Sequence, residues 1–288
     1  MDISVVVPFH NEQAYITRCV EALLSQDYPR DRYEIVLVDS NSTDRSADIV
    51  RQYSDVRLLS ESTPGSYAAR NRGVAASGGA TIAFTDSDCA PDRTWLSTIH
   101  EELSVPGTQV VLGRARYATE SLTLSMLANY ETAKAAYVFS SRNGEIYYGY
   151  TNNMAVRRPA FDAVGPFEAW MRGADTIFVC RLAEAFSADA VRYSPQMNIQ
   201  HLEMTSAWTW LGKKHLYGRS AQRSRAFARR RPLTRDERLT IYKETIRAHR
   251  YSVPQSMLLT ALLGAGWLSY ELGQRRPGRP AIPEAASR

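Results

Sequence analysis

The stretch TIAFTDSD, residues 81–88, is the most informative part of this chain. Its apolar part, residues 81–85, is too short for a helix and rich in β-formers, so it predicts a buried strand. Asp86 and Asp88 follow at once. At positions i and i+2 of extended chain their carboxylates would share one face, which is costly for unpaired like charges. A divalent cation held by these oxygens and by substrate phosphates would remove that cost; the alternative is a solvated turn.

Strands and helices alternate over the first hundred residues. The pattern predicts strands at 4–9, 33–38, 56–59 and 81–85, and helices at 16–24, from a cap at 42–44 through 50, and at 67–76. This order predicts an α/β fold with a mainly parallel sheet and helices on both faces. Ligands of such sheets bind beyond the carboxyl ends of the strands. Asn11, Asp39 and the Asp86–Asp88 segment all follow predicted strand ends, which favours a site there.

The later part of the chain is less regular. A strand is expected at 110–113, a helix at 122–138, and a loop at 149–153 that enters another strand. Beyond residue 205 the sequence becomes helical and basic without a clear core pattern.

Composition indicates a globular protein, with 44% apolar and 23% charged residues. Cysteines at 19, 89 and 180 have no ligand spacing, so neither a disulfide framework nor a zinc site is predicted, and reduced thiols fit a cytoplasm. The first residues contain no basic region or cleavage site, so we expect no secretory signal.

Charge is distributed unevenly along the chain. Residues 1–212 contain 18 Lys/Arg and 25 Asp/Glu, whereas residues 213–250 contain 13 Lys/Arg and 3 Asp/Glu. Nucleic-acid-binding proteins usually carry basic residues on the functional face, so an acidic body argues against nucleic acid as a partner. A basic segment beside an acidic body is better explained by a surface that meets anionic lipid.

Five short motifs together resemble glycosyltransferase family 2. They are VVVPFHNE (5–12), VDSNSTD (38–44), ARNRG (69–73), FTDSD (84–88) and GADT (173–176). Each is weak alone, but their order and spacing over roughly residues 3–205 are specific. The resemblance implies a GT-A fold, a nucleotide-sugar donor with UDP-sugars favoured, a divalent metal (Mn²⁺ or Mg²⁺) and inversion at the anomeric carbon.

The resemblance, together with the change in composition beyond residue 205, suggests a division of the chain. Residues 1–205 are expected to form the catalytic domain, with a nucleotide-sugar half at about 1–95 and an acceptor half at about 96–205. Residues 206–277 are expected to form a basic helical extension, and 278–288 a disordered tail.

The resemblance also places the donor nucleotide among residues at the strand ends and on the neighbouring helix. These are Pro8, His10, Glu12, Asp39, Asn41, Arg70, Asp86 and Ser87. Asp39 would accept a hydrogen bond from a base edge such as uracil N3–H; a turn or capping aspartate is the alternative. Arg70 would contact phosphate or ribose, or else is an ordinary surface arginine. Ser40 and Asn41 depart from the family's Asp and Gly, which puts the reading of the nucleotide in doubt.

Metal binding is expected at Asp88 as a direct ligand, with Asp86 facing the ribose and the water shell of the metal. His201 would complete the metal shell or touch the diphosphate; a structural histidine is the alternative. In such a site the metal acts as Lewis acid and template for the leaving diphosphate.

Asp175 is the predicted catalytic base, which takes the proton of the acceptor hydroxyl during inverting transfer. A simple N-cap role is the alternative. Ala174 stands where relatives often have Glu. Acceptor contacts are expected at Asn152, Asn153, Gly173 and Ala174.

The C-terminal part contains twenty uncharged residues, 251–270, of which only the fourteen at 257–270 are densely apolar. That length favours an interfacial or packed helix over a membrane span. With basic residues on both sides, we expect a helix on the anionic cytoplasmic leaflet. The alternative is a helix hairpin docked on the catalytic domain or on a second subunit. Trp208 and Trp210 fit sugar stacking or, by default, helix packing.

The sequence thus predicts an inverting, metal-dependent glycosyltransferase with a glycan or lipid-linked hydroxyl acceptor. Surface polysaccharide or lipid-linked glycan synthesis, peripheral on the inner face of the cell membrane, would suit the C-terminal part. One alternative is a non-catalytic interaction protein with the same fold. A sugar-nucleotide pyrophosphorylase is disfavoured because residues 10–13 contain neither the glycine nor the lysine of its phosphate loop.

Overall fold

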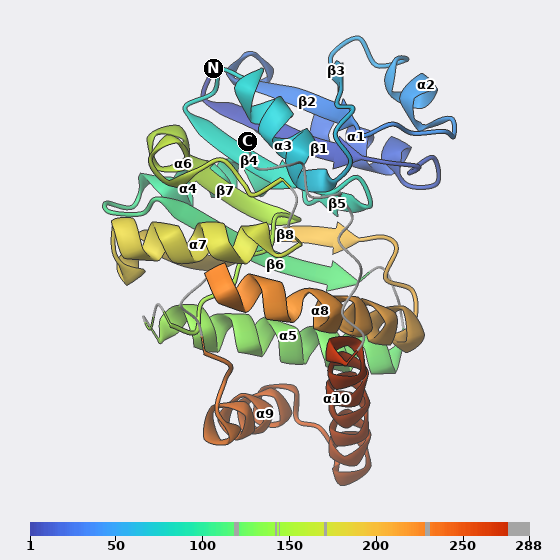
Figure 1. Ribbon diagram of the computed structural model, residues 1–288, viewed down its shortest axis with the longest axis vertical. Coiled ribbons are helices and arrows are strands. Elements are labelled where there is room, and N and C mark those ends of the chain that lie inside the picture. Colours follow the sequence, from blue (N-terminus) through green and yellow to red (C-terminus); the bar gives the residue numbers. More distant parts are fainter. Residues whose placement is uncertain (118–120, 142, 144, 170–171, 228–230, 276–288) are drawn as a thin grey trace, which may run out of the picture.

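The computed structural model describes residues 1–117, 121–141, 143, 145–169, 172–227 and 231–275. Within these residues eight strands form one sheet, with helices packed on both of its faces (Figure 1). The strands are β1 (Ile3–Phe9), β2 (Tyr33–Asp39), β3 (Arg57–Ser60), β4 (Thr81–Thr85), β5 (Cys89–Pro91), β6 (Val110–Tyr117), β7 (Asn153–Arg157) and β8 (Val191–His201). The α-helices are α1 (Ile16–Leu24), α2 (Ser46–Val50), α3 (Ser66–Ala75), α4 (Trp95–Ser104), α5 (Leu122–Ser140), α6 (Arg158–Val164), α7 (Ala174–Ala185), α8 (Ala207–Phe227), α9 (Arg235–His249) and α10 (Val253–Gln274).

The order of strands across the sheet is β3-β2-β1-β4-β7-β6-β8-β5. Strands β1 to β4 pair in parallel, β7 runs antiparallel to β4 and β6, β8 is parallel to β6, and β5 is antiparallel to β8. The carboxyl ends of β1, β2, β4, β6 and β8 therefore meet at one edge of the sheet. The first residues of β5 and β7 lie at the same edge.

Alternation along the strands builds a separate core on each face. Val5 and Val7 pack with Trp95 on one face, whereas Val6 packs with Phe84 on the other. All five side chains are fully buried. Because successive strand residues point to opposite faces, an unbroken apolar strand is what a sheet covered on both faces requires.

The predicted strands and helices are present, with bounds close to those expected. The expectation that residues 86–88 continue the strand is wrong. They form a turn between β4 and β5, in which the Cys89 amide donates to the Asp86 carbonyl at 3.0 Å. The turn brings Asp88 back toward β8, where β5 pairs with that strand through Cys89 and His201.

Helices α8 and α10 pack against each other and against α5 (Figure 1). Trp210 of α8 is buried among Leu124 and Leu127 of α5 and Leu262 of α10. The basic extension is therefore docked on the catalytic body, as the alternative interpretation held, and Trp210 packs between helices. Among the described residues, every helix is too short or too polar to cross a membrane. The expected tail at 278–288 lies outside the described residues.

Candidate active site

Two loops at the carboxyl ends of β1 and β2 are tied together by side-chain hydrogen bonds. Asn11 and Asn41 adopt positive φ values of 57° and 60°, which asparagine accepts more readily than most residues. The Asn11 side-chain oxygen accepts from the Thr43 amide at 2.8 Å. Asp39, half-buried at the end of β2, accepts from the Ser42 amide at 2.9 Å. Asp39 thus holds its own turn while its carboxylate stays at the sheet edge.

The next residues along the β1–α1 loop differ in exposure. The exposed His10 uses Nδ1 to donate to the Ser40 carbonyl at 2.7 Å. Glu12 is half-buried; burial and then the nearby Glu203 and Asp86 carboxylates raise its pKa to about 7. Pro8 is buried within β1. Of these three residues, Glu12 is therefore the one whose carboxylate interacts electrostatically with the other acids of the site.

Arg70 and Asp86 form an ion pair at the carboxyl end of β4. Arg70, on α3, is only 3% exposed and donates through Nη2 to Asp86 Oδ1. Its guanidinium also lies over the Tyr67 ring, 5.4 Å from the ring centroid. The alternative of an ordinary surface arginine is wrong, because Arg70 is buried. A buried guanidinium needs a charged partner, and Asp86 supplies it. Ser87, next in the turn, is buried.

Asp88 and His201 face each other across the β5–β8 pair. Both are buried, and Asp88 Oδ2 lies 3.5 Å from His201 Nδ1. Burial, with a contribution from Asp86, raises the pKa of Asp88 to about 7. Burial and then the Lys213 ammonium lower the pKa of His201 to about 4. The imidazole is therefore neutral at physiological pH.

Lys213 of α8 reaches this group of acids from the C-terminal extension. Its Nζ lies 3.1 Å from His201 Nε2 and 2.9 Å from Glu203 Oε2. Burial opposes the charged form, but the Glu203 hydrogen bond and the Asp88 charge raise the pKa of Lys213 overall. A residue outside the expected catalytic domain thus supplies a cation to the site.

The residues present fit a divalent metal. One potential ligand atom from each of Asp88, Cys89 and His201 lies within 4.8 Å of the others. Burial raises the pKa of Cys89 well above its ordinary value, so its thiol stays protonated, and a thiol is a poor partner for Mg²⁺ or Mn²⁺. His201 Nδ1, by contrast, is buried without a hydrogen-bond partner in the described part of the chain. Asp88 and His201 are therefore the better donor pair.

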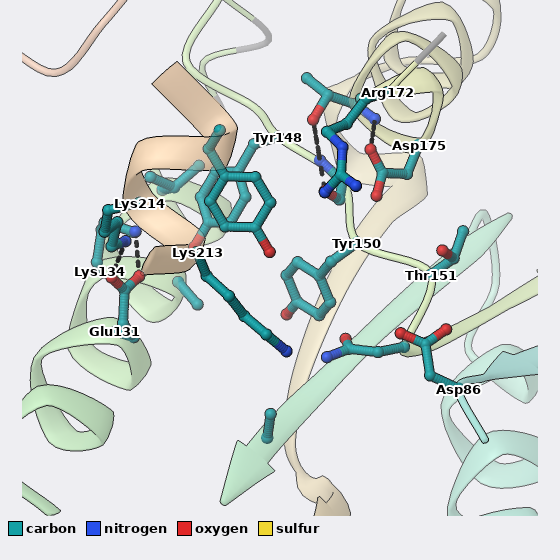
Figure 2. A pocket seen from close by; sticks show the side chains of 18 of the residues that line it. Asp86, Glu131, Lys134, Tyr148, Tyr150, Thr151, Arg172, Asp175, Lys213 and Lys214 are labelled. Atoms are coloured by element: carbon teal, nitrogen blue, oxygen red, sulfur yellow. Dashed lines mark hydrogen bonds and ion pairs between the residues drawn. The ribbon is translucent and has the colours of Figure 1, made fainter. Parts of the chain in front are cut away.

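A cavity of about 830 Å³ opens beside these groups and is lined by both Asp86 and Asp175. Asp175 lies in the first turn of α7, and its Oδ1 accepts from the Thr176 amide at 2.8 Å. Burial raises the pKa of Asp175, although the Tyr67 hydroxyl and the Thr176 amide act in the opposite direction. Figure 2 shows Asp175 and Asp86 on one side of the cavity, with Lys213 reaching toward it from the other. A carboxylate with a raised pKa in a cleft is suited to proton transfer.

The four expected acceptor residues are placed differently. Asn152 and Gly173 line the cavity, and Gly173, immediately before α7, has a φ of 90°. Ala174 is buried. The Asn153 side chain is also buried: it accepts from the Trp95 indole at 2.8 Å and donates to the Arg114 and Met197 carbonyls. Asn153 thus holds β6, β8 and α4 together and has no free group for an acceptor.

Several lining residues were not found from the sequence. Glu131 and Lys134 come from α5, and Lys213 and Lys214 from α8. Glu203, which pairs with Lys213 but does not itself line the cavity, follows His201 by two positions, and that proximity is the only sequence signal for it. The others lie on helices with weak amphipathic patterns, so no periodicity indicated which side chains face inward.

Residues 4–165 match the model of the family described as Glycosyl transferase family 2. The chain is 34% identical over 172 residues to glycosyltransferase AglE of Haloferax volcanii, covering 57% of this chain and 55% of that protein. It is 28% identical over 230 residues to a pre-mycofactocin glycosyltransferase of Mycobacterium tuberculosis, covering 76% and 47%. The chain spans about half the length of the curated relatives it matches.

Solved structures share the fold. A mannosyltransferase from Pyrobaculum calidifontis, in complex with GDP-Man and Mn²⁺, superposes with a TM-score of 0.64 at 19% identity, covering 95% of this chain and 82% of that one. Staphylococcus aureus TarS 1–349, in complex with UDP-GlcNAc, gives 0.52 at 16% identity, covering 96% and 91%. The predicted mixed, mainly parallel α/β architecture of the GT-A class, with a C-terminal helical extension, is confirmed.

Proposed function

We propose, from the premise that this chain belongs to glycosyltransferase family 2, that it transfers a sugar from a nucleotide diphosphate donor to a hydroxyl acceptor with inversion. The observation that carries the proposal is a single cavity lined by Asp86 and by Asp175. One carboxylate belongs to the acidic end, where a donor diphosphate and a metal fit. The other is the only described carboxylate lining the wall near the start of α7, where an acceptor hydroxyl fits.

The acidic end is suited to the donor. Asp39, at the end of β2, is proposed to bind the base edge, and Pro8, His10, Glu12, Asn41 and Ser87 are the other proposed donor contacts. Arg70 fixes Asp86 for the ribose side. Asp88 and His201 would hold Mn²⁺ or Mg²⁺, which when bound neutralises charge on the leaving diphosphate. A UDP-sugar is favoured; a solved structural relative in complex with UDP-GlcNAc supports this choice, and one in complex with GDP-Man keeps guanosine donors open.

Asp175 is the proposed base. It takes the proton of the acceptor hydroxyl as that oxygen bonds to the anomeric carbon, while the carbon–oxygen bond to the diphosphate breaks on the opposite face. The pKa of Asp175, raised by burial, makes its carboxylate a stronger base than an exposed one. Asn152 and Gly173 are proposed to contact the acceptor.

Membrane contact at the inner face of the cell membrane is proposed for the C-terminal helices. On α10 the side chains of Val253, Met257, Trp267 and Leu268 are each more than half exposed. Lys243, Arg247 and Arg250 are exposed on or just after α9, next to the start of α10. Apolar side chains beside cations are the composition that binds anionic lipid surfaces. A glycan or lipid-linked acceptor would be met there.

Calorimetric titration with UDP, GDP and TDP, each with and without Mn²⁺, tests the proposal. We expect one nucleotide to bind tightly and only with metal, and Asp88→Ala to abolish that binding. Asp162→Ala, an exposed carboxylate on α6, is the matched control and should bind like wild type. Binding of no nucleotide would favour the alternative, a non-catalytic member of the fold.

A further inference from the structure

Opposite ends of the cavity carry opposite charge. The donor end gathers carboxylates, with Glu12, Asp86, Asp88 and Glu203 acting on one another electrostatically. The far wall is basic and is formed by α5 and α8, which contribute Lys134 and Lys214. In Figure 2 the lysines and Glu131 lie on the side of the cavity away from Asp86. The proposed metal would compensate the donor end, whereas the two lysines of the far wall share Glu131 among the described residues.

Glu131 is shared between the two lysines. Its Oε2 accepts from Lys134, and its Oε1 accepts from Lys214 at 2.6 Å. The side chains of Glu131, Lys134 and Lys214 are 25%, 21% and 23% exposed. Lys134 Nζ lies 5.2 Å from the centroid of the Tyr148 ring, and Lys214 Nζ lies 4.6 Å from that of Trp210. Aromatic faces and one carboxylate thus fix both ammonium groups at the cavity wall.

Among the residues that the structure describes, Glu131 is the one carboxylate paired with either lysine, so two positive charges share one negative charge. Each ammonium has three N–H donors, and Glu131 takes one from each. Burial and the nearby Lys214 ammonium lower the pKa of Lys134. Together they outweigh the Glu131 carboxylate, which acts to raise it. Two half-buried cations on one anion are stable only if something else supplies negative charge or hydration.

Two arginines extend the basic wall. Arg114 of β6 is half-buried and donates through Nε to the Asn198 side chain at 2.7 Å, and no described carboxylate pairs with it. Arg172 precedes Gly173 just before α7 and is exposed. Both residues line the cavity. A ligand anion near the lysines would also feel these charges.

We infer that the acceptor carries an anionic group, a phosphate or a carboxylate, and that Lys134 and Lys214 bind it across the cavity from the donor site. This inference rests on the proposed transfer reaction, because it assigns the second substrate of the same cavity. Anion binding by two ammonium groups uses charge-assisted hydrogen bonds, which are stronger than neutral ones. The lysines would then hold the acceptor by its anionic group, at a distance from its reacting hydroxyl, and so place that hydroxyl near Asp175.

The test fills the donor site first and then titrates simple acceptor probes. With UDP and Mn²⁺ present at saturation, glucose 1-phosphate, glucuronic acid and octyl phosphate are compared with uncharged methyl glucoside by calorimetry. We expect at least one anionic probe to bind about tenfold or more tightly than methyl glucoside, since a charged hydrogen bond contributes ~1.5–3 kcal/mol. The three charged probes distinguish a sugar phosphate, a uronate and a lipid phosphate.

Variants assign the effect to the two lysines. Lys134→Met and Lys214→Met should each lower the affinity for the preferred anion about tenfold. Glu131→Gln should raise that affinity, because it releases both ammonium groups. A general loss of folding cannot produce these opposite signs. Arg93→Met, which removes an exposed cation just before α4 that does not line the cavity, is the control and should change nothing.

The outcomes separate this inference from the proposed reaction. Nucleotide binding with equal affinity for charged and uncharged probes overturns the inference alone. Unchanged anion binding in both lysine variants, or weaker binding in Glu131→Gln, also overturns it. A wild-type protein that binds no nucleotide overturns the proposed function and this inference together.

Discussion

The ammonium group of Lys213 lies 3.1 Å from Nε2 of His201. An ammonium can only donate, so Nε2 accepts, and the one ring proton of the neutral imidazole sits on Nδ1, facing Asp88. A metal ion needs the lone pair of Nδ1, which requires the proton to move to Nε2 and Lys213 to withdraw. Lys213 would therefore compete with the proposed metal, and without a metal its ammonium group is paired with Glu203 and lies next to His201.

Replacing this competitor should strengthen metal binding. In Lys213→Met we expect Mn²⁺ alone to bind about tenfold more tightly, which corresponds to ~1.4 kcal/mol of competition removed. Calorimetric titration with Mn²⁺ in the absence of nucleotide measures the effect. The matched control is Lys243→Met, with wild-type affinity. Equal or weaker Mn²⁺ binding in Lys213→Met would show that the lysine does not oppose the metal.

Asp175→Asn should reduce transfer by ~10²–10⁴-fold, since an amide cannot accept the acceptor proton. Binding of the nucleotide with Mn²⁺ should stay as in wild type, because the proposed role of Asp175 is on the acceptor and not on the donor. Burial raises the pKa of Asp175, so wild-type activity should fall as the pH drops through that raised value. Glu184→Gln, an exposed carboxylate on the same helix, serves as the control. A folded Asp175→Asn protein with near-normal transfer would contradict the assignment.

Stability should depend on pH through Asp88 and Glu12. Both carboxyls have a pKa of about 7 in the folded protein, above their ordinary values. The folded state binds these protons more tightly, so stability is lost as pH rises from the ordinary pKa through the raised one. In the metal-free protein, Asp88→Asn should reduce the fall in free energy of unfolding between about pH 5 and about pH 8 by roughly 1–3 kcal/mol.

Urea unfolding at the two pH values provides this measurement. Added Mn²⁺ should stabilise wild type more at the higher pH, where Asp88 is ionised and able to bind it. An identical pH dependence in wild type and Asp88→Asn would mean that Asp88 does not carry the effect.

Two glycines of α8 should respond in opposite ways to alanine. At Gly218 an added Cβ would lie 2.1 Å from the Tyr270 carbonyl oxygen of α10, whereas at Gly212 it would meet nothing within 4 Å. Gly218→Ala should lower the free energy of unfolding by ~1–3 kcal/mol through overpacking. Gly212→Ala should raise it by ~0.5–1 kcal/mol, because alanine is the better helix former. Thermal unfolding of both variants measures this, and unchanged stability in Gly218→Ala would contradict the tight fit assigned to Gly218.

Membrane binding should depend on the exposed apolar side chains of α10. Met257 and Trp267 are 69% and 61% exposed. Replacing both by glutamine should weaken binding to phosphatidylglycerol vesicles, and salt should weaken wild-type binding by screening. Co-sedimentation with vesicles measures both effects, with Val105→Gln on the catalytic body as the control. A wild-type protein that ignores these vesicles at low salt would exclude an anionic membrane partner.

The part of the site that lies at strand ends could be predicted from sequence. Short apolar runs indicate buried strands, and parallel pairing brings the carboxyl ends of those strands together. The positions of Asp39 and Asp86 at this edge of the sheet could therefore be predicted without a structure. The resemblance to family motifs supplied Asp175 and His201, which lie far along the chain from those strands.

The rest depended on geometry that sequence does not carry. A turn, rather than extended chain, follows β4, because the Cys89 amide closes onto the Asp86 carbonyl. Asn152 and Asn153 are neighbours, yet one lines the cavity and the other is buried, because adjacent residues entering a strand point to opposite faces. Lys134 and Lys214 meet only through helix packing between α5 and α8, which no local pattern specifies.

Because α8 packs closely against α10 at Gly218, the parts of the site form in a definite order during synthesis. A nascent chain makes the strands of the sheet, with Asp39, Asp86 and Asp88, long before α10 leaves the ribosome. Lys213 and Lys214 reach the cavity wall only when α8 packs against α10 and α5. The acidic end of the site is therefore synthesised first, and the basic wall of the cavity is completed last, when the C-terminal helices dock.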